Sequence, residues 1–232
     1  MIPTPRKPSH LDPRAERLLE WLGAQPWAGC VVLGGGVALK HYLDYRSTKD
    51  CDAWWGDATP SALKETVLAE IANALEQQNP GCKLRRDNWG EVQSLAVMEA
   101  GEAVFAFQIA ERTRQLEPYL VSAWGEVLLE SLTDNVASKM AALVDRGLGR
   151  DFSDIRHLHE QLGWQPAEFW QLWQRRFPGR SVADAQAKAR LKLEALMRSR
   201  PLEKVQPPSA RTALAAARVW FLNDLLTHDS GH

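Results

Sequence analysis

Two aspartates one residue apart, Asp50 and Asp52, have the type and spacing to do chemistry. They lie in the stretch DCDAWW, which reads as a buried strand, and alternate side chains of a strand point to the same face. The two carboxylates therefore face the same way, and they repel one another unless a cation lies between them. Either this end of the strand is solvated, or the pair binds a metal ion.

Three consecutive glycines, Gly34 to Gly36, separate the apolar stretch CVVL from VALKHYLDY, which has helical spacing. A glycine turn between a strand and a helix lets backbone amides approach a phosphate, and the helix N-terminus favours an anion. Taken alone, the run is more typical of a tight turn without a ligand, and it matches neither a P-loop nor the dinucleotide fingerprint. The order glycine turn, helix, D-x-D strand favours a metal-dependent triphosphate site, because Mg²⁺ bridges phosphates to carboxylates.

A second group of polar residues follows later in the chain. The stretch TDNVASKMAALVDRG predicts a helix that is capped by Thr133 and ends at Gly147. Its apolar face carries Lys139, and a lysine there is costly without a partner. The next helical segment places Asp151 and Asp154 on one face. Spacing leaves two alternatives open: a structural Lys139–Asp154 ion pair, or a cation and carboxylates that serve a site.

The elements that must position these residues change in kind along the chain. Up to about residue 121, strand-like stretches alternate with helical ones, and they include the hairpin pattern LRRDNWGEVQSLAVM and the strand AVFAFQIA. From Thr133 onward the pattern is almost entirely helical. We therefore expect an α+β fold, with an α/β domain at residues 1–125 and a helical C-terminal domain at residues 126–232.

Composition limits the possible partners and compartments. The chain has 232 residues, of which 45% are hydrophobic, and this allows a sizeable core. A net charge of −1 gives no global basic field that would recruit nucleic acid. The three cysteines fit neither a zinc site nor a disulfide framework, and no apolar run has the length of a membrane span. The number and spacing of the cysteines indicate a reducing compartment, and the N-terminus lacks a signal-peptide pattern, so we expect a cytoplasmic protein.

Two blocks of the sequence resemble a known family. GGGVALKHYLDYRSTKDCDAWW resembles the GG-x-A-L … R-x-T-x-D-x-D signature of the AbiEii/AbiGii-type nucleotidyltransferase toxins. ASKMAALVDRGLGRDFSDIRHL resembles the second signature of that family, a lysine helix followed by Arg-Asp and another aspartate three residues on. The resemblance covers roughly residues 28–160. It implies the mixed sheet with flanking helices of the DNA polymerase β-like nucleotidyltransferases.

The resemblance also implies an activity. Better understood members transfer a nucleoside monophosphate from a nucleoside triphosphate to an acceptor, in some cases the 3′ end of tRNA, with Mg²⁺ as cofactor. Many are toxins encoded beside a winged-helix antitoxin. We therefore expect a magnesium-dependent nucleotidyltransferase of a toxin–antitoxin or abortive-infection system. The alternatives are a catalytically degenerate member that binds nucleotide or a partner, and nucleotidyl transfer to protein.

Carried onto this sequence, the first signature assigns roles around the glycine turn. Gly35 and Gly36 would hold the triphosphate, Thr48 would contact a phosphate, and Asp50 and Asp52 would bind Mg²⁺.

The second signature adds a cation and carboxylates. Lys139 would neutralise the triphosphate, and Asp154, with Asp151, would complete the polar site. Arg150 would orient one of these carboxylates or contact a phosphate.

The sequence departs from the family pattern at two positions. Gln108 stands where a third carboxylate is expected, and glutamine offers a metal only a neutral carbonyl. Val37 stands where a hydroxyl is common. We expect both departures to weaken catalysis more than nucleotide binding.

The C-terminal helices carry a local excess of positive charge. Residues 181–218 contain eight basic and three acidic side chains, which leaves +5 on a protein of net charge −1. Such a patch could follow an RNA backbone, or its members could be ordinary solvated helix residues. The basic residues are Lys188, Arg190, Lys192, Arg198, Arg200, Lys204, Arg211 and Arg218.

Overall fold

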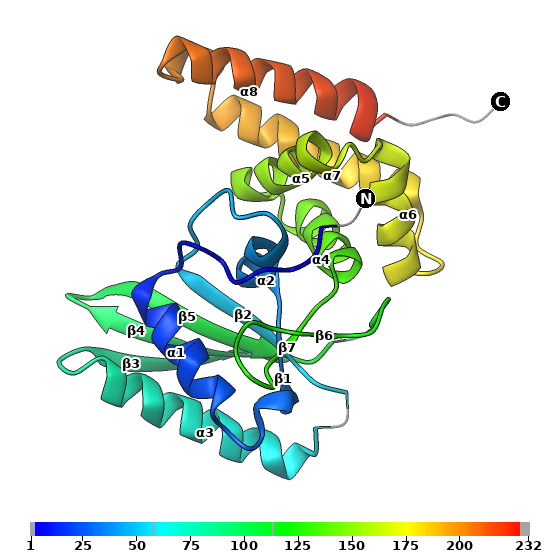
Figure 1. Cartoon of the computed structure of the whole chain (residues 1–232). Helices are drawn as coiled ribbons and strands as arrows, with labels where there is room; N and C mark the ends of the chain where they lie inside the picture. Colours follow the sequence, from blue (N-terminus) through cyan, green and yellow to red (C-terminus); the bar gives the residue numbers. More distant parts are fainter. Residues whose placement is uncertain (1–2, 58, 113, 228–232) are drawn as a thin grey trace. The chain divides into compact units, whose positions relative to one another are not determined.

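The computed structural model describes residues 3–57, 59–112 and 114–227 (Figure 1). The chain divides into two compact units, the first ending at Asn135 and the second beginning at Val136. This division falls within one helix, α4. The domain boundary expected between residues 125 and 126 stays a prediction.

The first unit is built on a mixed seven-stranded sheet, counted over its described residues, in the order β3-β4-β5-β2-β1-β7-β6. The pairs β2–β5 and β1–β7 are parallel, and the other neighbours are antiparallel. With its helices, this sheet confirms the α+β class. The strands are β1 (Val31–Leu33), β2 (Asp50–Trp55), β3 (Lys83–Trp89), β4 (Val92–Glu99), β5 (Glu102–Ala110), β6 (Leu120–Val121) and β7 (Leu128–Leu129).

Within the described residues, three α-helices accompany the sheet: α1 (Pro13–Gly23), α2 (Gly35–Tyr42) and α3 (Ser61–Gln78), with a short turn at Ala28–Cys30. The start of α1 follows from its sequence, because the Asp12 carboxylate accepts the Arg14 N–H at 2.8 Å and proline suits a first turn. Helix α1 packs against α3, and α2 packs against β2. In Figure 1, α2 and α3 lie on opposite sides of the sheet. Helix α2 therefore covers the side of β2 on which the glycine turn lies.

The segment before α1 is fastened to the end of α2 by one carboxylate. Asp44 accepts the Ser9 N–H at 2.7 Å and the Ser9 hydroxyl at 2.5 Å, and it forms an ion pair with Lys40. Partial burial would raise the pKa of the Asp44 carboxyl, but the hydrogen bonds from Lys40 and Ser9 outweigh it and lower this pKa to about 2. The ionised form of Asp44 is therefore the one that stabilises the fold.

This lowered pKa predicts a pH-dependent contribution to stability. A carboxyl whose pKa is lower in the folded than in the unfolded protein stabilises the fold above the unfolded value, near pH 4, and ceases to do so as the pH falls towards 2. Because Asp44 is partly exposed, we expect Asp44→Asn to lower the free energy of unfolding at pH 7 by only about 1 kcal/mol. Denaturant titrations of both proteins at pH 7 and pH 2 check this. A difference in stability that persists unchanged at pH 2 would contradict the assignment.

The second unit consists of helices. Apolar residues of α5 and α6 are buried in it, and Trp170 and Trp173 pack edge to face with ring centroids 5.8 Å apart. No helix within the described parts of the chain is long and apolar enough to cross a membrane. The helices are α4 (Leu132–Asp145), α5 (Gly149–Leu162), α6 (Pro166–Arg176), α7 (Val182–Ser199) and α8 (Pro208–Trp220), with short turns at Leu202–Lys204 and Phe221–Leu225.

The beginning of α4 corrects one expectation. Thr133 does not cap this helix, which already begins at Leu132. The cap is Ser131. Its hydroxyl accepts the Asp134 N–H at 3.0 Å and donates to the Asp134 carboxylate at 2.8 Å, so the two residues satisfy each other's hydrogen-bonding groups. The expected end is confirmed, because the Gly147 N–H donates to Ala142 and Gly147 has φ +59°.

Candidate active site

The three glycines each face one residue of β2 or of the loop before it. A Cβ atom on Gly34 would overlap the Trp54 indole, and one on Gly35 would overlap the Asp52 carboxylate. On Gly36 it would lie 2.9 Å from the Thr48 hydroxyl. The glycine run is therefore the means by which the turn before α2 approaches the D-x-D strand closely.

The two aspartates share a face of β2, as the alternation predicts. Asp50, Asp52 and Trp54 are half-buried, and the residues between them are buried. Burial, together with the negative charges of Asp52 and Asp50, raises the pKa of the Cys51 thiol on the opposite face. Cys51 is therefore an apolar core residue rather than a reactive thiol.

The register of the neighbouring strand β5 gives the position of Gln108 relative to the two aspartates. In the parallel β2–β5 pair, Asp50 lies opposite Ala106 and Asp52 lies opposite Gln108. Gln108 is half-buried, like the aspartates. A glutamine amide therefore stands beside Asp52, and its role in place of a third carboxylate stays a prediction.

The donor chemistry of this face fits Mg²⁺. Asp50 and Asp52 offer carboxylate oxygens, the ligands that Mg²⁺ prefers, and Mg²⁺ usually completes its shell with phosphates and water. Within the described residues, the Asp52 carboxylate has no cationic partner, and no group of three or more acidic, histidine or cysteine side chains could hold a metal. An ion here would thus be held by two carboxylates and a bound triphosphate.

Thr48 secures the start of this strand. Its hydroxyl donates to the Asp50 carbonyl at 3.1 Å and lies next to the Asp50 N–H at 3.4 Å. The same hydroxyl faces Gly36. Thr48 is thus placed between the D-x-D strand and the glycine turn, and its contact with a phosphate stays a prediction.

Sequence reasoning missed Glu130, which joins the glycine turn to the sheet. It follows β7, which pairs in parallel with β1, and its N–H continues the pairing by donating to the Leu33 carbonyl at 3.0 Å. Its side chain is fully buried, accepting the Gly35 N–H at 3.1 Å and the Trp54 indole N–H at 3.1 Å. The only signal in the sequence is an acid directly after the apolar run VLL, before a helix.

The charge of Glu130 is balanced by a second missed residue, Arg112. Arg112 forms ion pairs with Glu130 and, at 3.2 Å, with Asp134, and its guanidinium lies 5.1 Å from the Trp54 ring centroid. Asp134 also accepts the N–H groups of Leu116 and Glu117, each at 3.0 Å. A buried polar network therefore lies behind the glycine turn.

The second motif lies in the helical unit and forms a buried ion pair. Lys139 Nζ is 2.9 Å from Asp154 Oδ2, with 6% of the lysine and none of the aspartate exposed. This pair is the one that the structural alternative requires. Any function of Lys139 must therefore operate from a lysine that is already paired.

Asp151 and its neighbours close the turn between α4 and α5. The Asp151 carboxylate pairs with Arg146 through two hydrogen bonds of 2.9 and 2.7 Å, and it accepts the Leu148 N–H at 2.9 Å. Asp151 is fully buried, whereas Arg150 is exposed. These contacts give Asp151 a structural task, and its catalytic role, like that of Arg150, stays a prediction.

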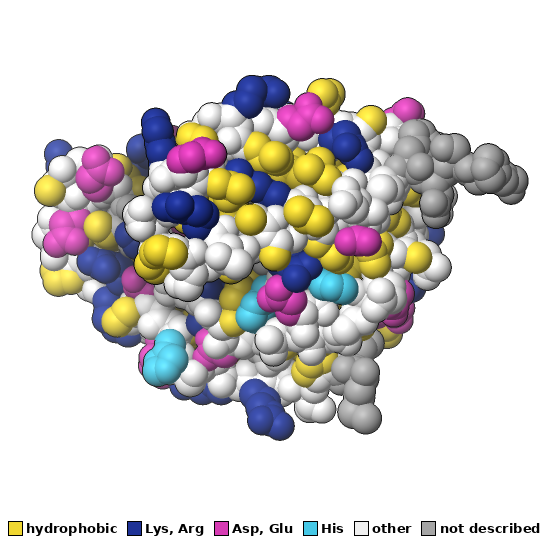
Figure 2. Space-filling model, turned by 90° about the horizontal axis from the view of Figure 1, so that it is seen from above, with side chains coloured by type: hydrophobic (Ala, Val, Ile, Leu, Met, Phe, Trp, Pro, Cys, Tyr) yellow, Lys and Arg dark blue, Asp and Glu magenta, His cyan; other side chains and the backbone are white. Residues whose placement is uncertain are grey.

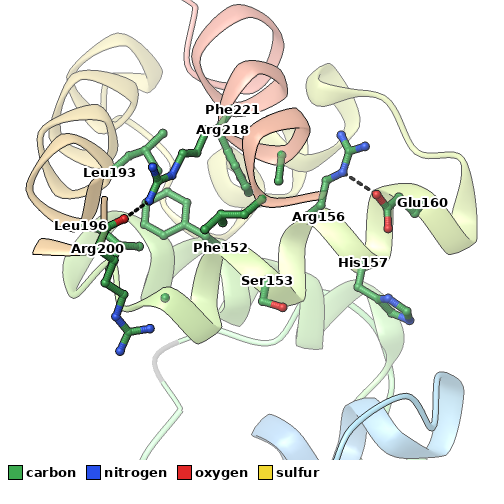
Figure 3. Close-up of a pocket in the computed structure, with 13 residues that line it drawn as sticks. Phe152, Ser153, Arg156, His157, Glu160, Leu193, Leu196, Arg200, Arg218 and Phe221 are labelled. Atoms are coloured by element: carbon green, nitrogen blue, oxygen red, sulfur yellow. Dashed lines mark hydrogen bonds and ion pairs between the residues drawn. The ribbon is translucent and has the colours of Figure 1, made fainter. Parts of the chain in front are cut away.

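The helical unit also contains a cavity of about 270 Å³ between α5, α7 and α8 (Figure 3). Phe152, Leu193 and Phe221 line it, and Arg156 at its edge pairs with Glu160 at 2.6 Å. None of the residues expected to form the site lines this cavity.

Several basic side chains of the C-terminal helices already have partners. Lys188 pairs with Asp145 at 2.6 Å, Arg190 donates to two carbonyls after α8, and Arg218 donates to the Arg200 carbonyl. Basic and acidic side chains are interspersed on the face that carries α8 (Figure 2). The expected RNA-binding role of these helices stays a prediction.

The packing of Gly35 predicts a large penalty for a single methyl group. Gly35 has φ +54°, and Gly90 at the β3–β4 turn has φ +61°, but only the Cβ added at Gly35 would meet other atoms. We expect Gly90→Ala to cost about 1 kcal/mol through backbone strain alone. Gly35→Ala should lower the free energy of unfolding by at least about 2 kcal/mol more than Gly90→Ala does. The added methyl group would displace Asp52 and separate β2 from the glycine turn. Denaturant unfolding compares the two variants, and equal costs would show that Gly35 is not packed against Asp52.

Comparison with known proteins identifies the family. A family model described as "Nucleotidyl transferase AbiEii toxin, Type IV TA system" matches residues 17–224. The chain belongs to this family. Both motifs of this AbiEii chain lie within the matched residues, the glycine turn with its D-x-D strand and the Lys139 helix with its Arg-Asp segment.

Two further comparisons accompany the family match. The crystal structure of the Megavirus polyadenylate synthase is similar to the AbiEii chain with a TM-score of 0.39 and 8% sequence identity. The similarity covers 93% of this chain and 51% of the synthase, so the chain spans about half the length of that protein. Comparison with curated protein sequences gave no significant match.

Proposed function

We propose that this chain is a magnesium-dependent nucleotidyltransferase that transfers a nucleoside monophosphate from a nucleoside triphosphate to an acceptor. The observation that carries the proposal is the packing of the glycine turn against the D-x-D strand, with Gly35 directly over Asp52, in a member of the AbiEii family. This packing places a helix N-terminus, which favours anions, beside two carboxylates of the kind that Mg²⁺ prefers.

Each part of the site has a task in this reaction. Backbone amides at the start of α2 bind phosphate oxygens. Asp50 and Asp52 would hold Mg²⁺, which would neutralise negative charge on the phosphates. An acceptor hydroxyl attacks the α-phosphorus and loses its proton, the bond from this phosphorus to the bridging oxygen breaks, and pyrophosphate leaves. We propose that Lys139 contributes positive charge towards the triphosphate, with Asp154 as the carboxylate that holds the lysine side chain.

The proposed acceptor is RNA, in particular the 3′ end of tRNA, and the proposed setting is a toxin opposed by a winged-helix antitoxin. Membership of a family described as toxins of type IV toxin–antitoxin systems supports the setting. The test incubates the protein with each of the four nucleoside triphosphates, labelled in the base, and with total RNA or purified tRNA. We expect label to join tRNA, and periodate oxidation of the tRNA 3′ end should abolish the transfer. Label in protein instead of RNA would show that the acceptor is a side chain.

A second candidate function is nucleotide or partner binding without catalysis, and Gln108 beside Asp52 is the observation that favours it. The double variant Asp50→Ala, Asp52→Ala separates the two candidates when it is expressed in bacteria whose growth the wild type inhibits. Loss of inhibition supports the enzyme. Retained inhibition would favour the binding protein.

A further inference from the structure

We propose that Glu130 is a positioning residue of the nucleotide site, and this inference rests on the proposed function. Its buried carboxylate accepts the Gly35 N–H and thereby fixes the glycine turn. The amides of Gly36 and Val37 are then the ones that bind the phosphates. Gly35, which the family resemblance assigns to the triphosphate, then contributes space beside Asp52 rather than a hydrogen bond to the ligand.

The contacts of Glu130 concentrate on the glycine turn. Oε1 accepts the Gly35 N–H and the Asn135 side-chain amide, and Oε2 accepts Trp54 Nε1 and pairs with Arg112. Asn135 also donates to the Gly35 carbonyl at 2.9 Å. Glu130 and Asn135 therefore hold the peptide groups on both sides of Gly35, and Trp54 packs against Gly34.

The arrangement of amides at the start of α2 identifies the groups left for a ligand. The first amides of a helix have no intrahelical acceptor. The Ala38 N–H already donates to the Gly34 carbonyl at 3.0 Å, and the Gly34 N–H donates to the Asp52 carbonyl at 2.9 Å. With Gly35 bound to Glu130, the amides of Gly36 and Val37 are the donors left without a protein acceptor among the residues that the structure describes.

The main chain of Glu130 is held independently of its carboxylate, which provides a matched control. The Tyr42 hydroxyl donates to the Glu130 carbonyl at 2.8 Å. Burial, with the charge of Glu130 adding to it, raises the pKa of this phenol, so it remains a donor. Tyr42→Phe removes a buried hydrogen bond to the main chain of Glu130 and leaves the glycine turn untouched. Glu130→Gln, in contrast, replaces one carboxylate oxygen by an amide group that can only donate, and this group faces two of the four side-chain partners.

The experiment combines amide NMR of ¹⁵N-labelled protein with a non-hydrolysable triphosphate and Mg²⁺. In the wild type we expect the Gly36 and Val37 amides to shift on binding and the Gly35 amide to exchange slowly with solvent before and after it. Glu130→Gln should speed Gly35 exchange and weaken triphosphate binding by about tenfold or more, the size of a lost hydrogen bond to a charged group. In Tyr42→Phe, the Gly35 exchange rate and the triphosphate affinity should both stay within about twofold of the wild type.

Two results would overturn the positioning role. One is a folded Glu130→Gln protein with wild-type triphosphate affinity. The other needs no variant: a Gly35 amide that exchanges rapidly, or that shifts as much as Gly36 and Val37 when the triphosphate binds. A slowly exchanging Gly35 amide in a wild-type protein that binds no triphosphate would instead reject the proposed function while the Glu130–Gly35 contact stood.

Discussion

Replacing Asp52 by asparagine should lower the rate of nucleotidyl transfer by about a thousandfold or more while the protein stays folded. A catalytic metal contact contributes several kcal/mol to the barrier, and each tenfold in rate corresponds to about 1.4 kcal/mol. Asparagine has the same size as aspartate, so its packing beneath Gly35 is preserved. Stability should stay equal or rise, because the remaining Asp50 no longer faces a like charge.

A remote acid supplies the control for this result. Asp87 on β3 pairs with Arg85 at 2.7 Å, and both lie away from the glycine turn on an edge strand of the sheet. Asp87→Asn should keep wild-type transfer rates. Rates are measured under single-turnover conditions with labelled triphosphate, and a near wild-type rate for Asp52→Asn would eliminate the metal-binding role.

Replacing Lys139 by methionine should destabilise the protein by about 3–5 kcal/mol. The substitution removes the cation from a pair with 2.9 Å between Nζ and Oδ2, and it leaves the fully buried Asp154 carboxylate without its lysine. Adding Asp154→Leu should restore most of this loss, since an apolar pair often replaces a buried ion pair at little cost. Denaturant unfolding of both single variants and the double variant gives the coupling energy. A Lys139→Met protein as stable as the wild type would contradict the buried pair.

The double variant also separates the two alternatives for Lys139 that spacing alone left open. If the lysine serves only the fold, the restored Lys139→Met, Asp154→Leu protein transfers nucleotide at the wild-type rate. If it contributes charge to the triphosphate, the same protein is stable, inactive and weak in triphosphate binding. We expect the second result, because the lysine belongs to the second motif of the matched family region.

The parts of the site that were predicted from sequence are those that local pattern encodes. Period-two alternation puts Asp50 and Asp52 on one face of the strand. A glycine run between an apolar and a helical stretch indicates a turn that can approach its neighbours closely. Register between distant strands is not local. Glu130 reaches Gly35 only because β7 lies in parallel beside β1, and the pairing of two short strands almost a hundred residues apart leaves no periodic signal.

Helix spacing likewise placed Lys139 and Asp154 on inward faces but did not give the distance between them. The predicted cap of α4 was wrong for a related reason. Ser131 and Thr133 are both capping residue types, and the hydrogen bonds between Ser131 and Asp134 select Ser131. The charge of the C-terminal helices was countable from sequence. The carbonyl partners of Arg190 and Arg218, however, depend on how α7, α8 and the turn after α8 pack.

The position of the label in the triphosphate tests the central claim most directly. The protein is incubated with Mg²⁺, tRNA and one nucleoside triphosphate labelled in parallel samples at the α- or the γ-phosphate. The geometry of the glycine turn and the D-x-D strand predicts that the α-label joins the acceptor and that the γ-label leaves as pyrophosphate, with both events lost in Asp52→Asn. Transfer of the γ-label to any acceptor, or α-label incorporation that survives in Asp52→Asn, would contradict it.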